Sequence, residues 1–175
     1  MGLHASYYPI PSATLAGLIA NVHSDGFWKE VSRFREEYVK GGKEFYIGTA
    51  WHVLDFIINP PGAAVPELLY AVRGHEFPAP DGSARPEPHL ASYDDEYWQV
   101  YSYVTSAEAE LIAQYLPLIE EAEFDARFTP RKMKGIYRAP ASTEGRREYF
   151  EVLTGLQEFY GKVAAAQMAV LIGIG

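Results

Sequence analysis

The sequence predicts an α+β fold: a small mixed sheet packed with about five to six helices in a single compact domain. Some segments carry apolar residues at helical spacing, whereas others show the alternating or uniformly apolar pattern of strands. The two kinds of segment do not alternate regularly, which favours α+β over a doubly wound sheet. The chain has 175 residues, and it shows no internal repeat and no linker long enough to divide it. We therefore expect one domain over residues 1–175.

The first forty residues are expected to form one strand and two helices. Residues 3–10 have β-compatible side chains, and Ser12 is a suitable N-cap for the helix that follows. A second helix begins near residue 24 and ends at Gly41-Gly42, because glycine is a common helix stop.

The third helix has the clearest pattern in the chain. Its apolar residues recur on one helical face: Ile47, Ala50, Trp51, Leu54, Ile57 and Ile58. An Asn-Pro-Pro-Gly run at residues 59–62 ends the helix, because proline cannot continue the hydrogen-bond ladder. This pattern places Trp51 at the centre of a buried stripe.

The remaining residues predict three strands and two helices with loops between them. The three strands are expected over 68–73, 97–104 and 168–174, with a long proline-rich loop over 75–96 between the first two. A capping box at 105–108 opens the first helix, and Pro117 ends or bends it. An irregular basic stretch over 127–142 and a long helix around 149–163 follow. The last strand is apolar on both faces, which is typical of a buried central strand.

Several short motifs occur in a defined order along the chain. They are Met1-Gly2 with Ser6-Tyr7-Tyr8, Ala50-Trp51-His52-Val53-Leu54, residues 68–74, residues 103–108, residues 128–133 with Ile136-Tyr137, and the closing helix and strand. Together they resemble the YfbM-like family of bacterial domains of unknown function. Asp55 stands where a second histidine often occurs in that family. The resemblance covers nearly the whole chain and implies a compact α+β fold, but it implies no activity.

The composition excludes several classes of protein. A formal net charge of −8 repels phosphate backbones, so we expect no nucleic-acid partner. The chain has no cysteine, which excludes a disulfide framework and fits a soluble cytoplasmic protein. Its longest apolar run, residues 163–174, is too short to span a membrane. No phosphate-binding loop, nucleophile elbow or zinc-binding helix motif occurs, so we expect no cofactor.

His52 is the candidate acid–base residue. It shares a helical face with Asp55, which can orient the imidazole, and in a cleft the pair would suit a small hydrolase or transferase. The alternative is that His52 forms a structural hydrogen bond with Asp55 or a backbone carbonyl at the edge of the core. Because His52 lies off the apolar stripe, we expect His52→Ala to leave the fold intact and to cost little stability. His4, His75 and His89 are scattered along the chain, so the sequence predicts no metal site.

The expected strand at 97–104 carries the candidate binding residues. Alternation places Tyr97, Tyr101 and Tyr103 on one face, and tyrosine suits interfaces because it combines an apolar body with a polar tip. With Trp51 they favour a non-catalytic binding or protein-interaction module, which would contact another protein or a second copy of the chain. The alternative is that helices cover both faces of the strand.

Overall fold

The computed structural model describes residues 3–22, 24, 26–62, 64–77 and 100–175. Its strands are β1 (Ala5–Ile10), β2 (Phe45–Gly48), β3 (His75–Glu76), β4 (Val100–Val104) and β5 (Ala169–Ile174). Its α-helices are α1 (Ser12–Ala20), α2 (Phe27–Lys40), α3 (Trp51–Ile58), α4 (Ser106–Tyr115), α5 (Glu121–Arg127) and α6 (Arg146–Ala165). Three short 3-10 helices are η1 (Pro66–Leu68), η2 (Leu116–Leu118) and η3 (Pro130–Met133). The α+β class predicted from the sequence is confirmed.

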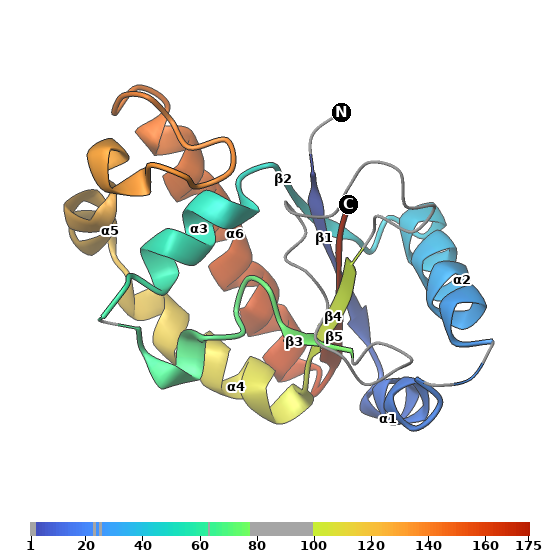
Figure 1. The fold of residues 1–175 in the computed structure, drawn as a ribbon. Coiled ribbons are helices and arrows are strands. Elements are labelled where there is room, and N and C mark those ends of the chain that lie inside the picture. Colours follow the sequence, from blue (N-terminus) through green and yellow to red (C-terminus); the bar gives the residue numbers. More distant parts are fainter. Residues whose placement is uncertain (1–2, 23, 25, 63, 78–99) are drawn as a thin grey trace.

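The strands form one sheet in the order β2-β1-β5-β4-β3 (Figure 1). Every pairing in it is antiparallel, so the expectation of a mixed sheet was wrong. Apolar pattern alone does not encode strand direction, which is why the sequence did not reveal it. All six residues of β5 are buried at the centre of the sheet, as its uniformly apolar sequence predicted.

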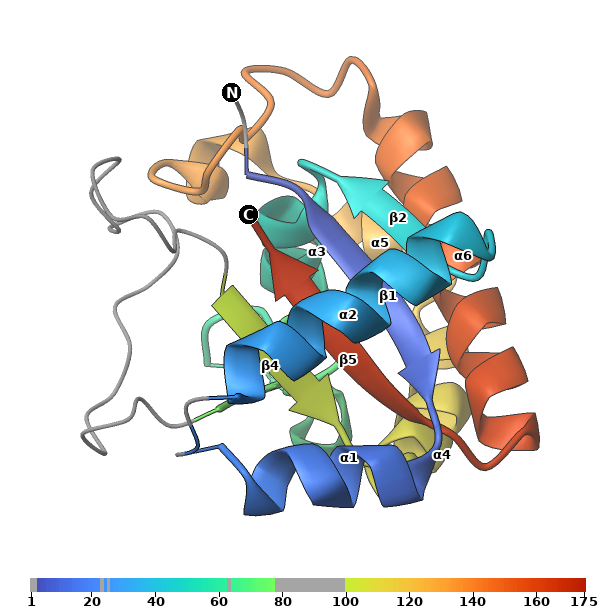
Figure 2. The same cartoon turned by 90° about the vertical axis from the view of Figure 1, so that its right-hand side faces the viewer.

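Helices cover both faces of the sheet. Helices α1 and α2 lie on one face, and α3, α4 and α6 lie on the other, as Figures 1 and 2 show together. Because side chains alternate along a strand, β1 sends Tyr7 to the core beneath α3, α4 and α6, and Tyr8 to the smaller core beneath α1 and α2. In the same way β5 sends Ile172 to the larger core and Leu171 to the smaller one.

Local signals placed most helix ends correctly. Helix α2 ends immediately before Gly41, and α4 ends before Pro117, where η2 takes over. The predicted capping box is present: the Thr105 side chain accepts from the Glu108 amide at 3.3 Å, and the Glu108 carboxylate accepts from the Thr105 amide at 2.9 Å. This box fixes the first turn of α4 and the orientation of the Glu108 side chain.

Several segments differ from the prediction. The stretch expected as a loop from residue 75 begins with β3, because His75 and Glu76 pair with β4, and α5 was not predicted. Ile47 lies in β2, not in the third helix, which begins at Trp51. The apolar side chain of Ile47 fits the pattern of a strand as well as that of a helix. Residues 68–73 form the end of η1 and a series of turns instead of a strand, because Pro66 starts a 3-10 helix there.

The chain then enters β3 at Gly74, whose φ is 62°. A Cβ at Gly74 would lie 2.7 Å from the Tyr103 carbonyl oxygen, so only glycine fits.

The irregular stretch expected over 127–142 contains η3, and α5 precedes it. Most of the proline-rich loop and Tyr97 lie outside the described residues. In the part of the chain that the structure describes, no helix is both long and apolar enough to cross a membrane.

Candidate functional site

His52 lies in the core next to Trp51. The two rings stack with centroids 4.7 Å apart, and His52 is only 8% exposed. Its Nδ1 atom accepts a hydrogen bond from the Tyr137 amide at 3.0 Å, which ties the segment after η3 to α3. The hydrogen-bond partner shown here is a backbone amide, not the backbone carbonyl expected from the sequence, and His52 is buried more deeply than its position off the apolar stripe predicts.

Asp55 has structural partners of its own. Its carboxylate lies 3.2 Å from Arg73 Nε and accepts a hydrogen bond from the Asn59 side chain at 3.1 Å. These contacts connect α3 to the turns that follow η1. They assign Asp55 to holding the fold together at this point.

The aromatic candidates divide into buried and half-buried residues. Trp51 is fully buried, and its Nε1 atom donates to the Leu3 carbonyl at 3.3 Å. Tyr101 is 4% exposed and belongs to the smaller core with residues of α1 and α2. Burial raises the pKa of Tyr101, although a hydrogen bond with Arg35 acts in the opposite direction. Neither Trp51 nor Tyr101 is therefore part of an open surface, because the chain's own helices cover them. The third described candidate, Tyr103, is half-buried.

The best-formed chemical site lies elsewhere, between the 66–70 segment and α4. A pocket of about 300 Å³ is lined there by Pro66, Glu67, Tyr70, Glu108, Leu111 and Ile112. Its walls are mainly apolar, and the charged groups among these described lining residues are the carboxylates of Glu67 and Glu108. We call this feature the α4 pocket.

Glu108 connects the α4 pocket to the sheet. One oxygen of its carboxylate accepts a hydrogen bond from His75 Nε2 on β3, and the other accepts from the Thr105 hydroxyl at 2.7 Å and the Thr105 amide. Burial acts to raise the pKa of Glu108, but the hydrogen bonds from His75 and Thr105 outweigh it and lower the pKa below its ordinary value. The carboxylate is therefore charged and held in one orientation.

His75 is held between two tyrosine rings. Its ring centroid lies 3.5 Å from that of Tyr70 and 5.4 Å from that of Tyr103. The imidazole thus fixes Tyr70, which forms part of the pocket wall, while Glu108 fixes the imidazole. The arrangement can orient a ligand or take part in proton transfer, since an imidazole paired with a carboxylate suits both roles.

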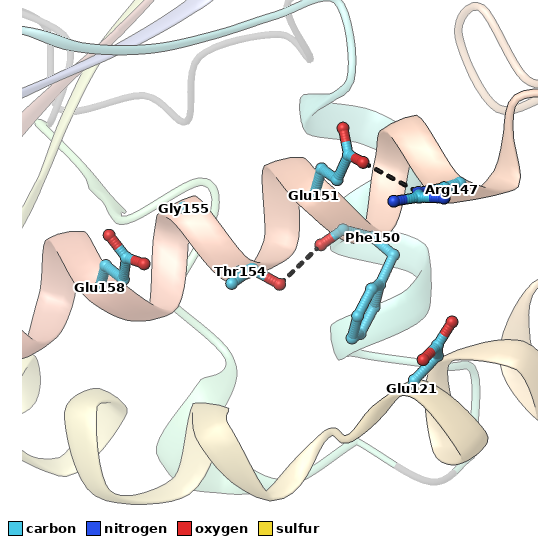
Figure 3. Close-up of a pocket in the computed structure, with 7 residues that line it drawn as sticks. All are labelled: Glu121, Arg147, Phe150, Glu151, Thr154, Gly155 and Glu158. Atoms are coloured by element: carbon cyan, nitrogen blue, oxygen red, sulfur yellow. Dashed lines mark hydrogen bonds and ion pairs between the residues drawn. The ribbon is translucent and has the colours of Figure 1, made fainter.

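A second and larger hollow lies along α6 (Figure 3). It has a volume of about 600 Å³ and is lined by Glu121, Arg147, Phe150, Glu151, Thr154, Gly155 and Glu158. Arg147 pairs with Glu151 at 3.1 Å, and the Thr154 hydroxyl donates to the Phe150 carbonyl at 3.0 Å. The Arg147–Glu151 pair and the Thr154 hydrogen bond are therefore both made within α6, and the other two lining carboxylates, Glu121 and Glu158, lie on α5 and α6.

The sequence did not single out the α4 pocket. In the sequence, His75 is one of several scattered histidines, and the only pattern that contains Glu108 is the capping box. The two residues are 33 positions apart, and no local motif joins them. Among the described residues, no group of three or more histidine, aspartate or glutamate side chains is placed to hold a metal ion.

Fold and site together define an α+β domain with an antiparallel sheet between two helical layers and a small pocket beside α4. The chain belongs to a family known as a domain of unknown function, DUF1877, whose model matches residues 1–173. It is also similar in fold to YfbM from Escherichia coli, a protein of unknown function with a known crystal structure. The two share 15% sequence identity with a TM-score of 0.64, over 98% of this chain and 99% of that chain.

These matches confirm the family resemblance found in the sequence. At 15% identity the likeness to YfbM concerns the fold alone. No curated protein has a significant sequence match to this chain.

Proposed function

We propose that this protein is a non-catalytic interaction module that binds a partner protein through the α4 pocket. The observation that carries the proposal is a group of large apolar side chains exposed at and beside the pocket: Leu69, Tyr70 and Leu111 are 44%, 36% and 41% exposed. Apolar side chains gathered around a pocket are typical of protein–protein interaction sites.

The size of the pocket supports a side chain as its ligand. About 300 Å³ is at the lower end of the range for small-molecule sites, and it suits one inserted amino-acid side chain. Tyr70 is already held in place by His75, so less conformational entropy is lost on binding. A rigid aromatic residue at the rim of a pocket is a common anchor for a bound peptide.

The proposal is tested by selecting displayed peptides against the wild-type protein and measuring their affinities for two variants. Leu111→Asp puts a charge at the pocket, whereas Val39→Asp makes the same kind of change at an exposed apolar residue of α2, on the opposite face of the sheet. We expect Leu111→Asp to weaken the selected peptides at least about tenfold and Val39→Asp to leave them unchanged. Peptides that bind both variants equally well would contradict the proposal.

A second candidate function is acid–base catalysis, and it rests on the His75–Glu108 pair at the edge of the α4 pocket. In a small hydrolase or transferase this pair would take the role that the sequence suggested for His52 and Asp55. The test is hydrolysis of a panel of nitrophenyl esters and phosphates by the wild-type protein and by His75→Asn. Turnover that His75→Asn abolishes would favour this candidate, and turnover that it leaves unchanged would exclude it.

We also propose that the protein acts in the bacterial cytoplasm. The support is its cysteine-free composition and the bacterial origin of YfbM.

A further inference from the structure

We propose that the partner of the α4 pocket is a basic peptide segment, and that it inserts a lysine or arginine side chain whose charged end pairs with Glu67. This inference rests on the proposed function, because it names the chemistry that the same pocket selects. It follows from the hydrogen bonds that the two carboxylates in the pocket already accept and from the charges on the segments that form the pocket.

The two carboxylates differ in what they already bind. Each oxygen of Glu108 already accepts a hydrogen bond within the protein, one from His75 and the other from Thr105. Glu67 lines the same pocket and is half-buried, yet it makes no ion pair or hydrogen bond with any other residue that the structure describes. Glu67 is therefore the carboxylate with its full capacity to accept a hydrogen bond from a ligand.

A partner that closes the pocket has to provide a hydrogen-bond donor or a positive charge for the carboxylate of Glu67. Covering an ionised carboxylate with apolar groups removes its water and leaves a buried unpaired charge, which is strongly unfavourable. A lysine or arginine avoids this cost, because its aliphatic stem packs on apolar walls while its charged end pairs with the carboxylate. Leu111, Ile112 and Pro66 provide those walls. The face of an aromatic ring such as Tyr70 attracts a cation in addition.

The charge around the pocket also favours a basic partner over a second copy of this chain. The two segments that form the pocket, residues 64–72 and 106–116, contain no lysine or arginine, and the charged residues among them that line the pocket are Glu67 and Glu108. Two copies meeting through this surface would place these glutamates opposite each other, and like charges at an interface are destabilising. A basic segment instead finds complementary charge in the pocket.

The experiment uses two fluorescent peptides of the same leucine-, alanine- and arginine-containing sequence. One carries arginine, and the other carries citrulline, its neutral isostere, at every arginine position. Affinities are measured by fluorescence anisotropy for the wild-type protein, Glu67→Gln, Glu110→Gln and Leu111→Asp. Glu110 is the matched control, because it is an exposed glutamate on α4 that does not line the pocket.

We expect the arginine peptide to bind the wild-type protein about tenfold more tightly than the citrulline peptide, with a difference that falls as salt is raised. Glu67→Gln should remove this preference, and Glu110→Gln should keep it. Thermal unfolding should be unchanged in Glu67→Gln, because the residue has no partner among the described residues to lose.

Other outcomes overturn the inference in distinguishable ways. Equal binding of both peptides, abolished by Leu111→Asp, would show an apolar site and leave the proposed function standing. A preference for arginine that survives Glu67→Gln, or that Glu110→Gln removes equally, would show only a general attraction to an acidic protein. If neither fluorescent peptide binds although displayed peptides bind through Leu111, the pocket selects a ligand other than a basic peptide. If no displayed peptide depends on Leu111, the proposed function itself fails.

Discussion

Two histidines in similar aromatic surroundings differ in what their imidazoles do. His52 stacks on Trp51 in the core, and its Nδ1 atom accepts a hydrogen bond from the backbone of Tyr137. His75 stacks on Tyr70 at the surface, and it donates to a carboxylate that lies in a pocket. The first imidazole satisfies a backbone amide, whereas the second orients side chains that a ligand can reach.

The difference teaches that the surroundings of a histidine in space, and not its neighbours in sequence, decide its role. His52 has a carboxylate three positions away, which looked like an acid–base pair, yet Asp55 holds Arg73 and Asn59. His75 has its carboxylate partner on another element of the fold. Four predictions test this contrast between a structural core region and an accessible pocket.

The largest effect is expected in the core. Trp51→Ala should destabilise the protein by about 3–5 kcal/mol, because it removes a fully buried indole and the ring that packs on His52. It also removes the donor to the Leu3 carbonyl. Urea unfolding measures the change. A midpoint close to that of the wild type would mean that this region is not a rigid core and that His52 is not confined by it.

The same burial argument applies to Tyr101. Tyr101→Ala should cost about 3 kcal/mol, because it opens a cavity in the core beneath α1 and α2. The sedimentation coefficient should stay that of the wild type, since the side chain has almost no exposed surface for a partner. A folded protein of unchanged stability that has lost self-association would instead place Tyr101 at an interface.

The two histidines themselves should differ in the same direction. His52→Ala leaves the Tyr137 amide without its acceptor at a buried site and should cost about 1–3 kcal/mol. His75→Ala breaks a hydrogen bond at a half-exposed site and should cost about 1 kcal/mol or less. Thermal unfolding of both variants under one set of conditions gives the comparison. A larger loss for His75→Ala would reverse the assignment of structural and accessible roles.

The smallest effect concerns the charge on Glu108. Glutamine can keep the capping box, so Glu108→Gln removes mainly the charge and should cost about 1 kcal/mol at neutral pH. The pKa of Glu108 is lowered in the folded protein, so its stabilising contribution is present above the unfolded value of about 4.3. It is lost as the pH falls through the lowered pKa.

The unfolding free energies of the wild type and Glu108→Gln should therefore converge in acid. Urea titrations at neutral pH and at several acidic pH values measure this. A difference that does not change with pH would show that the variant loses packing and not charge. Glu110→Gln, at an exposed position of the same helix, should match the wild type throughout.

Local signals in the sequence were sufficient wherever one segment determines its own structure. The glycine at 41, the proline at 117 and the capping box at 105–108 each act on residues within one turn, and all three ended or began helices as expected. The apolar stripe of α3 was also correct from Trp51 onward. Ile47 was misassigned because one apolar residue fits the spacing of a helix and of a strand.

The sequence by itself determined the α+β class, the ends of α2 and α4, the capped start of α4 and the burial of β5, because periodicity and caps depend on neighbours along the chain. Only the tertiary structure decided the antiparallel order of the strands, the burial of His52 and Tyr101, and the pairing of His75 with Glu108. Each of these depends on residues far apart in the chain that meet only when helices and sheet pack. The α4 pocket is such a meeting of η1, its following turn and α4, and no single segment of the chain encodes it.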